Sequence, residues 1–161
     1  MLCFNYRLRG NGKQMLTLEP VIKESDLTNV CGSLAKDPEG LNWLAFYENP
    51  ENWMKTLAHA TRKALVAYVD GLAAGFIDLE FDRAGRQAVI SYYLSPEFRG
   101  QGYAREFLAS SLAWIKENTS ARVVFAYANT ENTQSIRVLD KANFRYETKR
   151  QDMLCFVTAL N

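Results

Sequence analysis

One short stretch constrains the fold of this chain more than any other: the sequence SPEFRGQGYAREF, which begins at Ser95. Apolar, strand-like sequence precedes it, and the pattern of an amphipathic helix follows it. Between Arg99 and Arg105 there are two glycines, Gly100 and Gly102, and no acidic residue. The first N–H groups of a helix have no partner within the helix, the helix dipole adds partial positive charge, and glycines let a phosphate approach the backbone. The turn is therefore predicted to bind a pyrophosphate; the alternative is a turn in which the glycines only relieve strain.

The spacing of the glycines limits the kind of phosphate site. A Walker loop needs Gly-Lys-Ser/Thr, but Tyr103 and Ala104 follow Gly102. The dinucleotide-binding pattern GxGxxG fails at its third glycine, where this chain has Arg105. The sequence fits R-x-x-G-x-A instead, beginning at Arg99.

Composition excludes several classes of protein. The chain has 161 residues, 48% of them hydrophobic, and a formal net charge of +1, which argues against a nucleic-acid-binding surface. Its three cysteines, Cys3, Cys31 and Cys155, are odd in number and far apart, so neither a disulfide framework nor a metal site is expected. This usage fits a reduced, cytoplasmic setting. No stretch is long and apolar enough for a membrane span or a signal peptide.

The domain organisation is expected to be simple. Residues 1–14 resemble a flexible arm, and ordered strand-like sequence begins at Met15, which could be an alternative start of translation. Residues 15–161 are expected to form a single domain.

The order of elements predicts a mixed α/β domain with a central sheet. Helices are expected over residues 23–37, over 41–63 with a break at Pro50, over 102–118 and over 133–144. In the third of these, apolar and small residues recur at i, i+3, i+4, i+7, i+8 and i+11 from Ala104. Asn132 is expected to cap the last helix and Asn143 to end it in a left-handed conformation. Strands are expected over 15–21, 64–71, 72–82, 87–95, 121–129 and, as a pair, 145–160.

Two longer motifs carry a family resemblance. The first reads YYLSPEFRGQGYARE from Tyr92, and the second reads NTQSIRVLDKANF from Asn132, with Asn143 where the family has glycine. At this spacing, residues 88–146 resemble the GNAT acetyltransferase superfamily, and within it the RimJ/RimL-like branch. The first half of the chain fits in element order only.

The resemblance implies a fold and a cofactor site. The fold is a mixed, mostly antiparallel sheet, splayed between its fourth and fifth strands, with helices on both faces. Acetyl-CoA is the implied co-substrate, with no metal. The pantetheine arm would pair with Tyr93 and Leu94, and Asn132 and Ser135 would contact the cofactor. The pyrophosphate would bind the turn formed by Arg99, Gly100, Gln101, Gly102, Tyr103, Ala104 and Arg105.

The resemblance also identifies catalytic candidates. Many GNAT enzymes protonate the leaving thiolate with a tyrosine seven residues after the asparagine, but this chain has Leu139 there. In the RimJ/RimL-like branch a nearby serine can take that role, which indicates Ser135; an ordinary first-turn serine is the alternative.

An alkyl ammonium has a pKa of about 10 and must lose a proton before it attacks a thioester. Asp78 and Glu80 lie two apart in a strand and so share a face; Glu80 is the preferred base, and a solvated strand face is the alternative. Tyr92 and Tyr127 could line the amine channel or hold a water, or could simply pack.

The leading hypothesis is an acetyl-CoA-dependent N-acetyltransferase acting on a primary amine by direct attack in a ternary complex. No cysteine lies where a covalent acetyl intermediate is suggested. The acceptor could be a protein N-terminus or a small amine, and the protein a monomer or a homodimer, with no nucleic acid or membrane partner. The alternative is an acyl-CoA-binding regulatory module without turnover.

Overall fold

The fold is organised around one seven-stranded sheet. The computed structural model describes residues 15–161; the predicted arm of residues 1–14 lies outside them. The sheet order is β1-β2-β3-β4-β5-β7-β6, and among the described strands only β4 and β5 pair in parallel. The strands are β1 (Leu16–Pro20), β2 (Arg62–Val69), β3 (Leu72–Phe81), β4 (Gln87–Leu94), β5 (Val123–Asn129), β6 (Arg145–Arg150) and β7 (Met153–Ala159).

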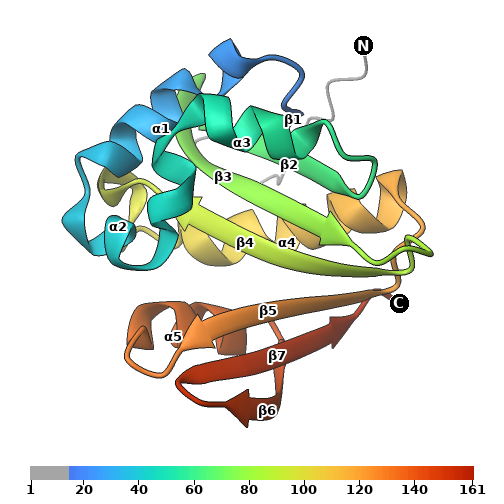
Figure 1. Ribbon diagram of the computed structural model, residues 1–161. Coiled ribbons are helices and arrows are strands. Elements are labelled where there is room, and N and C mark those ends of the chain that lie inside the picture. Colours follow the sequence, from blue (N-terminus) through green and yellow to red (C-terminus); the bar gives the residue numbers. More distant parts are fainter. Residues whose placement is uncertain (1–14) are drawn as a thin grey trace.

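Helices cover both faces of the sheet, as predicted (Figure 1). They are α1 (Thr28–Ala35), α2 (Pro38–Leu44), α3 (Pro50–Leu57), α4 (Tyr103–Asn118) and α5 (Thr133–Lys141). Short 3₁₀ turns add η1 (Glu24–Asp26), η2 (Ala45–Glu48) and η3 (Pro96–Phe98). No helix among residues 15–161 is long and apolar enough to cross a membrane. Nor do these residues bring together three or more His, Cys, Asp or Glu side chains that could hold a metal ion.

Two hydrophobic cores lie on opposite faces of the sheet. In β2, Leu65 and Ala67 pack on the α4 side, whereas Ala64 and Val66 pack on the α1–α3 side. Successive side chains of a strand point to opposite faces, so a central strand covered on both sides is apolar at nearly every position. This explains the continuous apolar sequence of β2.

The sheet opens between β4 and β5, as the family resemblance predicted. The ladder between them runs from Gln87 opposite Val123 to Ile90 opposite Ala126 and includes no later pair. Beyond it, β4 remains paired with β3 as far as Leu94. In Figure 1 the two strands diverge toward α5. The divergence creates the space in which the candidate site lies.

Local signals explain most element boundaries. Asp70 and Gly71 adopt positive φ in the β2–β3 turn, Asn132 caps α5 through the Ser135 N–H, and Asn143 adopts a φ of 63° after α5. The predicted helix over 23–37 is interrupted instead. The Asp26 carboxylate accepts hydrogen bonds from the backbone N–H groups of Ile22 and Lys23, which fixes the start of η1. Helix α1 begins only after this turn, at Thr28.

Candidate functional site

A large cleft fills the space between β4 and β5. Its volume is about 1450 Å³, above the usual range for a site that holds one drug-sized ligand. It is lined by α2, the end of β4, the glycine turn, the first turns of α4, the end of β5 and one face of α5. This volume leaves room for a long donor molecule together with a second substrate.

The glycine turn lies at one end of the cleft. Gly100 and Gly102 have φ values of 72° and 85°, a region that disfavours residues with a Cβ, and both line the cleft. Gly102 is the N-cap of the 16-residue helix α4, and no side chain caps it. No N-cap side chain therefore occupies the start of α4, and an exposed helix start with its dipole is the arrangement that an anion site needs.

The Arg99 side chain holds this turn in place. Its Nη2 lies 2.5 Å from Asp37 Oδ2, and its Nε donates to the Leu94 carbonyl at 2.8 Å. The Tyr93 hydroxyl also donates to Asp37, at 3.1 Å. We call Asp37, Arg99 and Tyr93 the Asp37 cluster. Burial acts to raise the pKa of Asp37, but hydrogen bonds from the Gly40 N–H and from Arg99 outweigh it and lower that pKa. Arg99 thus has a buried carboxylate partner, although its side chain still lines the cleft and remains 20% exposed.

Other basic side chains line the cleft and belong to none of the ion pairs formed within residues 15–161. They are Arg105 of α4 and Arg137 and Lys141 of α5. Sequence reasoning missed Arg137 and Lys141 as site residues. Their i, i+4 spacing, which places two cations on one helix face, was the available signal.

The free edge of β4 faces the cleft. Ser95 N–H donates to Ala74 O at 2.8 Å, and the antiparallel alternation then directs the backbone groups of Tyr93 toward β3. The backbone groups of Tyr92 and Leu94 point the other way, beyond the last pair with β5. Leu94 and Tyr93 were predicted to pair with a pantetheine arm. The backbone groups of Leu94 do point toward the cleft, but those of Tyr93 point toward β3, and Tyr92 is the neighbouring residue whose backbone groups point toward the cleft.

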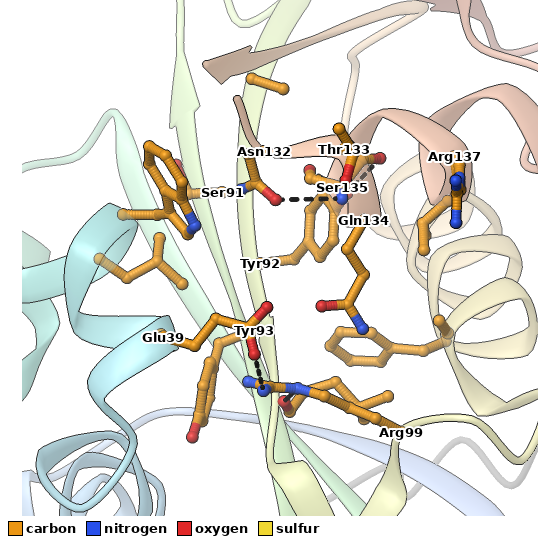
Figure 2. Close-up of a pocket in the computed structure, with 18 of the residues that line it drawn as sticks. Glu39, Ser91, Tyr92, Tyr93, Arg99, Asn132, Thr133, Gln134, Ser135 and Arg137 are labelled. Carbon is orange, nitrogen blue, oxygen red and sulfur yellow. Dashed lines mark hydrogen bonds and ion pairs between the residues drawn. The ribbon is translucent and has the colours of Figure 1, made fainter. Parts of the chain in front are cut away.

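Ser135 and Tyr92 meet across the cleft (Figure 2). The Tyr92 hydroxyl lies 2.7 Å from Ser135 Oγ, and Asn132 fixes the start of α5 by accepting from the Ser135 N–H at 3.2 Å. Burial raises the pKa of Tyr92 to about 12, so its phenol is neutral at pH 7. Leu139, at the position of the family tyrosine, is fully buried in the core beneath α5.

The structure does not bring Glu80 to the cleft. Its carboxylate is exposed and pairs with Arg62 Nη1 at 3.0 Å. The physical reason is its register: Glu80 lies opposite Val89, where β4 is still paired with β5. Tyr127, by contrast, lies beyond the ladder and lines the cleft with 52% of its surface exposed.

Two residues of the predicted turn keep their side chains outside the cleft lining. Gln101 is exposed and donates to the Glu97 carbonyl at 2.6 Å, and Tyr103 is buried with its ring against Phe98. Any contact these two make with a phosphate is through the backbone. Ala104 does line the cleft, at the first turn of α4.

Comparisons with known proteins agree with this geometry. Residues 15–145 match the family described as "Acetyltransferase (GNAT) domain". No curated protein matches the sequence at a significant level. Among solved structures, a ribosomal-protein-S5-alanine acetyltransferase from Vibrio fischeri has a TM-score of 0.75 at 15% identity, covering 98% of this chain and 97% of its own.

Two further structures show the same fold. A spermidine N-acetyltransferase from Vibrio cholerae has a TM-score of 0.70 at 18% identity, covering 90% of this chain and 94% of its own. The N-acetyltransferase PseH from Campylobacter jejuni, solved with acetyl coenzyme A, has a TM-score of 0.71 at 12% identity, covering 91% of this chain and 99% of its own.

Proposed function

The chain belongs to the GNAT acetyltransferase family, and from this premise we propose that it transfers the acetyl group of acetyl-CoA to a primary amine by direct attack in a ternary complex. The observation that carries the proposal is the cleft between β4 and β5. One cavity joins the start of α4, which has no side-chain cap, a free strand edge and a pair of hydroxyl groups.

The proposed donor position follows the chemistry of the lining. The pyrophosphate would bind the backbone from Gly100 to the start of α4, because glycines at positive φ leave it open to close approach. Arg105, Arg137 and Lys141 would add positive charge along the phosphates. The pantetheine arm would then run along the backbone groups of Tyr92 and the N–H of Leu94, since the Leu94 carbonyl already accepts from Arg99.

The chemical step would use two groups of this chain, a backbone N–H of β4 and the Ser135 hydroxyl. A β4 backbone N–H, of Tyr92 or Leu94, would donate to the thioester oxygen as negative charge develops there. The free amine attacks the thioester carbon, a C–N bond forms, and the C–S bond breaks. Ser135, itself hydrogen-bonded to Tyr92, would donate to the departing sulfur.

Proton transfer from Tyr92 to the sulfur would be uphill, since its pKa of about 12 exceeds that of a thiol. The new amide nitrogen still carries a surplus proton after the attack. That nitrogen is therefore the proposed source of the proton that completes the CoA thiol.

The lining also bears on the acceptor. Trp43 of α2, Tyr127 and Met153 all line the cleft, and each of these side chains is at least 37% exposed. Glu39 is the only acidic residue that lines the cleft within the described chain, and it lies 3.6 Å from Arg99. An acceptor with several positive charges would find little compensation there. These contacts favour an amine with a single charge on an apolar body, either a small amine or a protein N-terminus.

The test is thiol release from acetyl-CoA by the purified protein with three acceptor sets. These are peptides with free N-termini, simple amines together with polyamines, and aminoglycosides. We expect release with mono-amines or peptides, and less with polyamines. Binding of acetyl-CoA without release in any set would instead favour the regulatory, non-catalytic alternative.

A further inference from the structure

A second buried carboxylate lies behind the cleft. Asp78 is 3% exposed. Its Oδ1 accepts from Trp53 Nε1 at 3.0 Å, and its Oδ2 accepts from the Tyr47 hydroxyl at 2.9 Å and from Arg62 Nη2 at 2.6 Å. We call these four residues the Asp78 cluster. Nothing in the proposed donor site uses this cluster, although Asp78 is the most buried carboxylate among the described residues.

Ser91 connects the cluster to the cleft. It is the direct cross-strand partner of Asp78 in the β3–β4 ladder, so the two side chains lie on the same face of the sheet. Ser91 also lines the cleft. The Ser91 hydroxyl lies close enough to Tyr47 to act to lower the pKa of its phenol, and the Tyr47 hydroxyl donates to Asp78 Oδ2 at 2.9 Å. Two hydroxyl groups, those of Ser91 and Tyr47, therefore lie between the cleft wall and the buried carboxylate.

We propose that Ser91, Tyr47 and Asp78 form the proton relay that deprotonates the acceptor amine. This inference rests on the proposed function and names the base that it lacks. The ammonium N–H gives its proton to Ser91 Oγ, the Ser91 proton moves to the Tyr47 oxygen, and the Tyr47 proton moves to Asp78 Oδ2. Both hydroxyls end neutral, Asp78 ends as the acid, and the amine is free to attack. After the products leave, the proton returns to water by the same path.

The surroundings of Asp78 suit a transient proton acceptor. The titratable or charged groups that face it are Tyr47 from η2, Arg62 from β2 and Glu80 from its own strand. Burial raises the pKa of the Asp78 carboxyl, and the donors Trp53, Arg62 and Tyr47 offset this only in part. Burial also raises the pKa of Tyr47 to about 12, so the tyrosine passes protons in concert and does not remain as a phenolate.

The test compares two matched Tyr→Phe variants. Tyr47→Phe breaks the relay but leaves Asp78 with Trp53 and Arg62. Tyr68→Phe, on the same side of the sheet but outside the cleft lining, is the control. With an alkyl amine at pH 7, we expect kcat/KM of Tyr47→Phe to fall by about 100-fold, the lower end of the usual range for general base catalysis. The Tyr68→Phe variant should stay within about twofold of wild type, because Tyr68 does not line the cleft and, among residues 15–161, contacts neither Ser91 nor Asp78 through a hydrogen bond.

The pH profile separates a relay from a structural role. The loss in Tyr47→Phe should shrink as the pH approaches the amine pKa of about 10, because the amine then arrives without its extra proton. Asp78→Asn should show the same convergence. A loss that is constant across the pH range, or no loss at all, would overturn the relay while leaving the transferase intact. A wild-type protein that releases no CoA with any amine would overturn the proposed function, and the relay with it.

Discussion

The two buried aspartates have similar partners and opposite electrostatics. Asp37 and Asp78 each accept from a tyrosine hydroxyl and from an arginine. The pKa of Asp37 is lowered, whereas burial raises that of Asp78. The difference comes from the backbone. Asp37 is the N-cap residue of α2, where the backbone N–H of Gly40 acts to lower the pKa of its carboxyl, whereas Asp78 lies inside a strand whose amides are used by the sheet.

This comparison separates a fixed charge from a proton acceptor. The Asp37 cluster keeps its carboxylate ionised and holds the turn that would receive the donor phosphates. The Asp78 cluster holds a carboxylate that costs more to ionise, next to the wall where the amine would lie. In this protein, the buried aspartate at the start of a helix suits a fixed negative charge, and the one inside a strand suits a proton acceptor.

The largest expected effect comes from destroying the turn that the Asp37 cluster supports. Gly102→Glu places a side chain and a negative charge at the start of α4, at a φ of 85°. We expect acetyl-CoA affinity, measured by calorimetry, to fall by about 100-fold or more, which is about 2.7 kcal/mol. Gly85→Glu is the matched control, because Gly85 has a φ of 68° but lies in the β3–β4 turn outside the cleft lining. Tight binding by Gly102→Glu would contradict the site.

The second prediction tests the ionised carboxylate of Asp37. Asp37→Asn leaves Arg99 without its buried carboxylate, and we expect acetyl-CoA to bind about tenfold more weakly because the turn loosens. Urea unfolding should show a loss of about 1–3 kcal/mol in the free energy of unfolding. Asp78→Asn should leave acetyl-CoA affinity unchanged. Equal losses of affinity in the two variants would remove the distinction between the clusters.

A smaller effect is expected for a cation without a buried partner. Arg137→Gln should weaken acetyl-CoA binding by about two- to fivefold, the scale of an exposed ion pair. The loss should diminish at high ionic strength, because salt screens exposed charges. The free energy of unfolding should not change. A loss of affinity that is independent of salt would indicate that Arg137 has a packing role instead.

The smallest effect is a difference in how stability depends on pH. The lowered pKa of Asp37 adds stability that is present above its usual value of 3.8 and is lost as pH falls through the lower folded-state value. The raised pKa of Asp78 costs stability as pH rises through and above 3.8. The stability of wild type relative to Asp37→Asn should therefore rise as the pH rises. Its stability relative to Asp78→Asn should fall as the pH rises. Urea titrations between about pH 3 and 7 would measure both slopes, and slopes of equal sign would refute the contrast.

The sequence predicted the fold well where local patterns decide it. The 3.6-residue periodicity of α4, the Asn132 cap and the glycine turn are encoded within a few residues of one another. The family motifs supplied the rest, including the opening between the fourth and fifth strands.

Glu80, the preferred base from the sequence, lies outside the cleft for a physical reason. Asp78 and Glu80 share a strand face, and period-2 alternation cannot tell them apart. Which of them is buried depends on Trp53 and Tyr47, which reach Asp78 from elements more than 20 residues away in the sequence. Whether the backbone groups of Tyr92 or of Tyr93 point toward the cleft likewise depends on which residues of β4 hydrogen-bond to β3. Only the pairing of the two strands defines this.

The short ladder between β4 and β5 has a mechanical consequence. Only four residue pairs join the strands, so the backbone groups beyond Ile90 lack a neighbouring strand on that side. A pantetheine arm bound there would act as a surrogate strand and complete the sheet. The substrate would then be a structural part of the molecule, and at a concentration 100 times its Kd it would add about 2.7 kcal/mol to the free energy of unfolding. Saturation with acetyl-CoA would in this way stiffen the protein as well as supply its acetyl group.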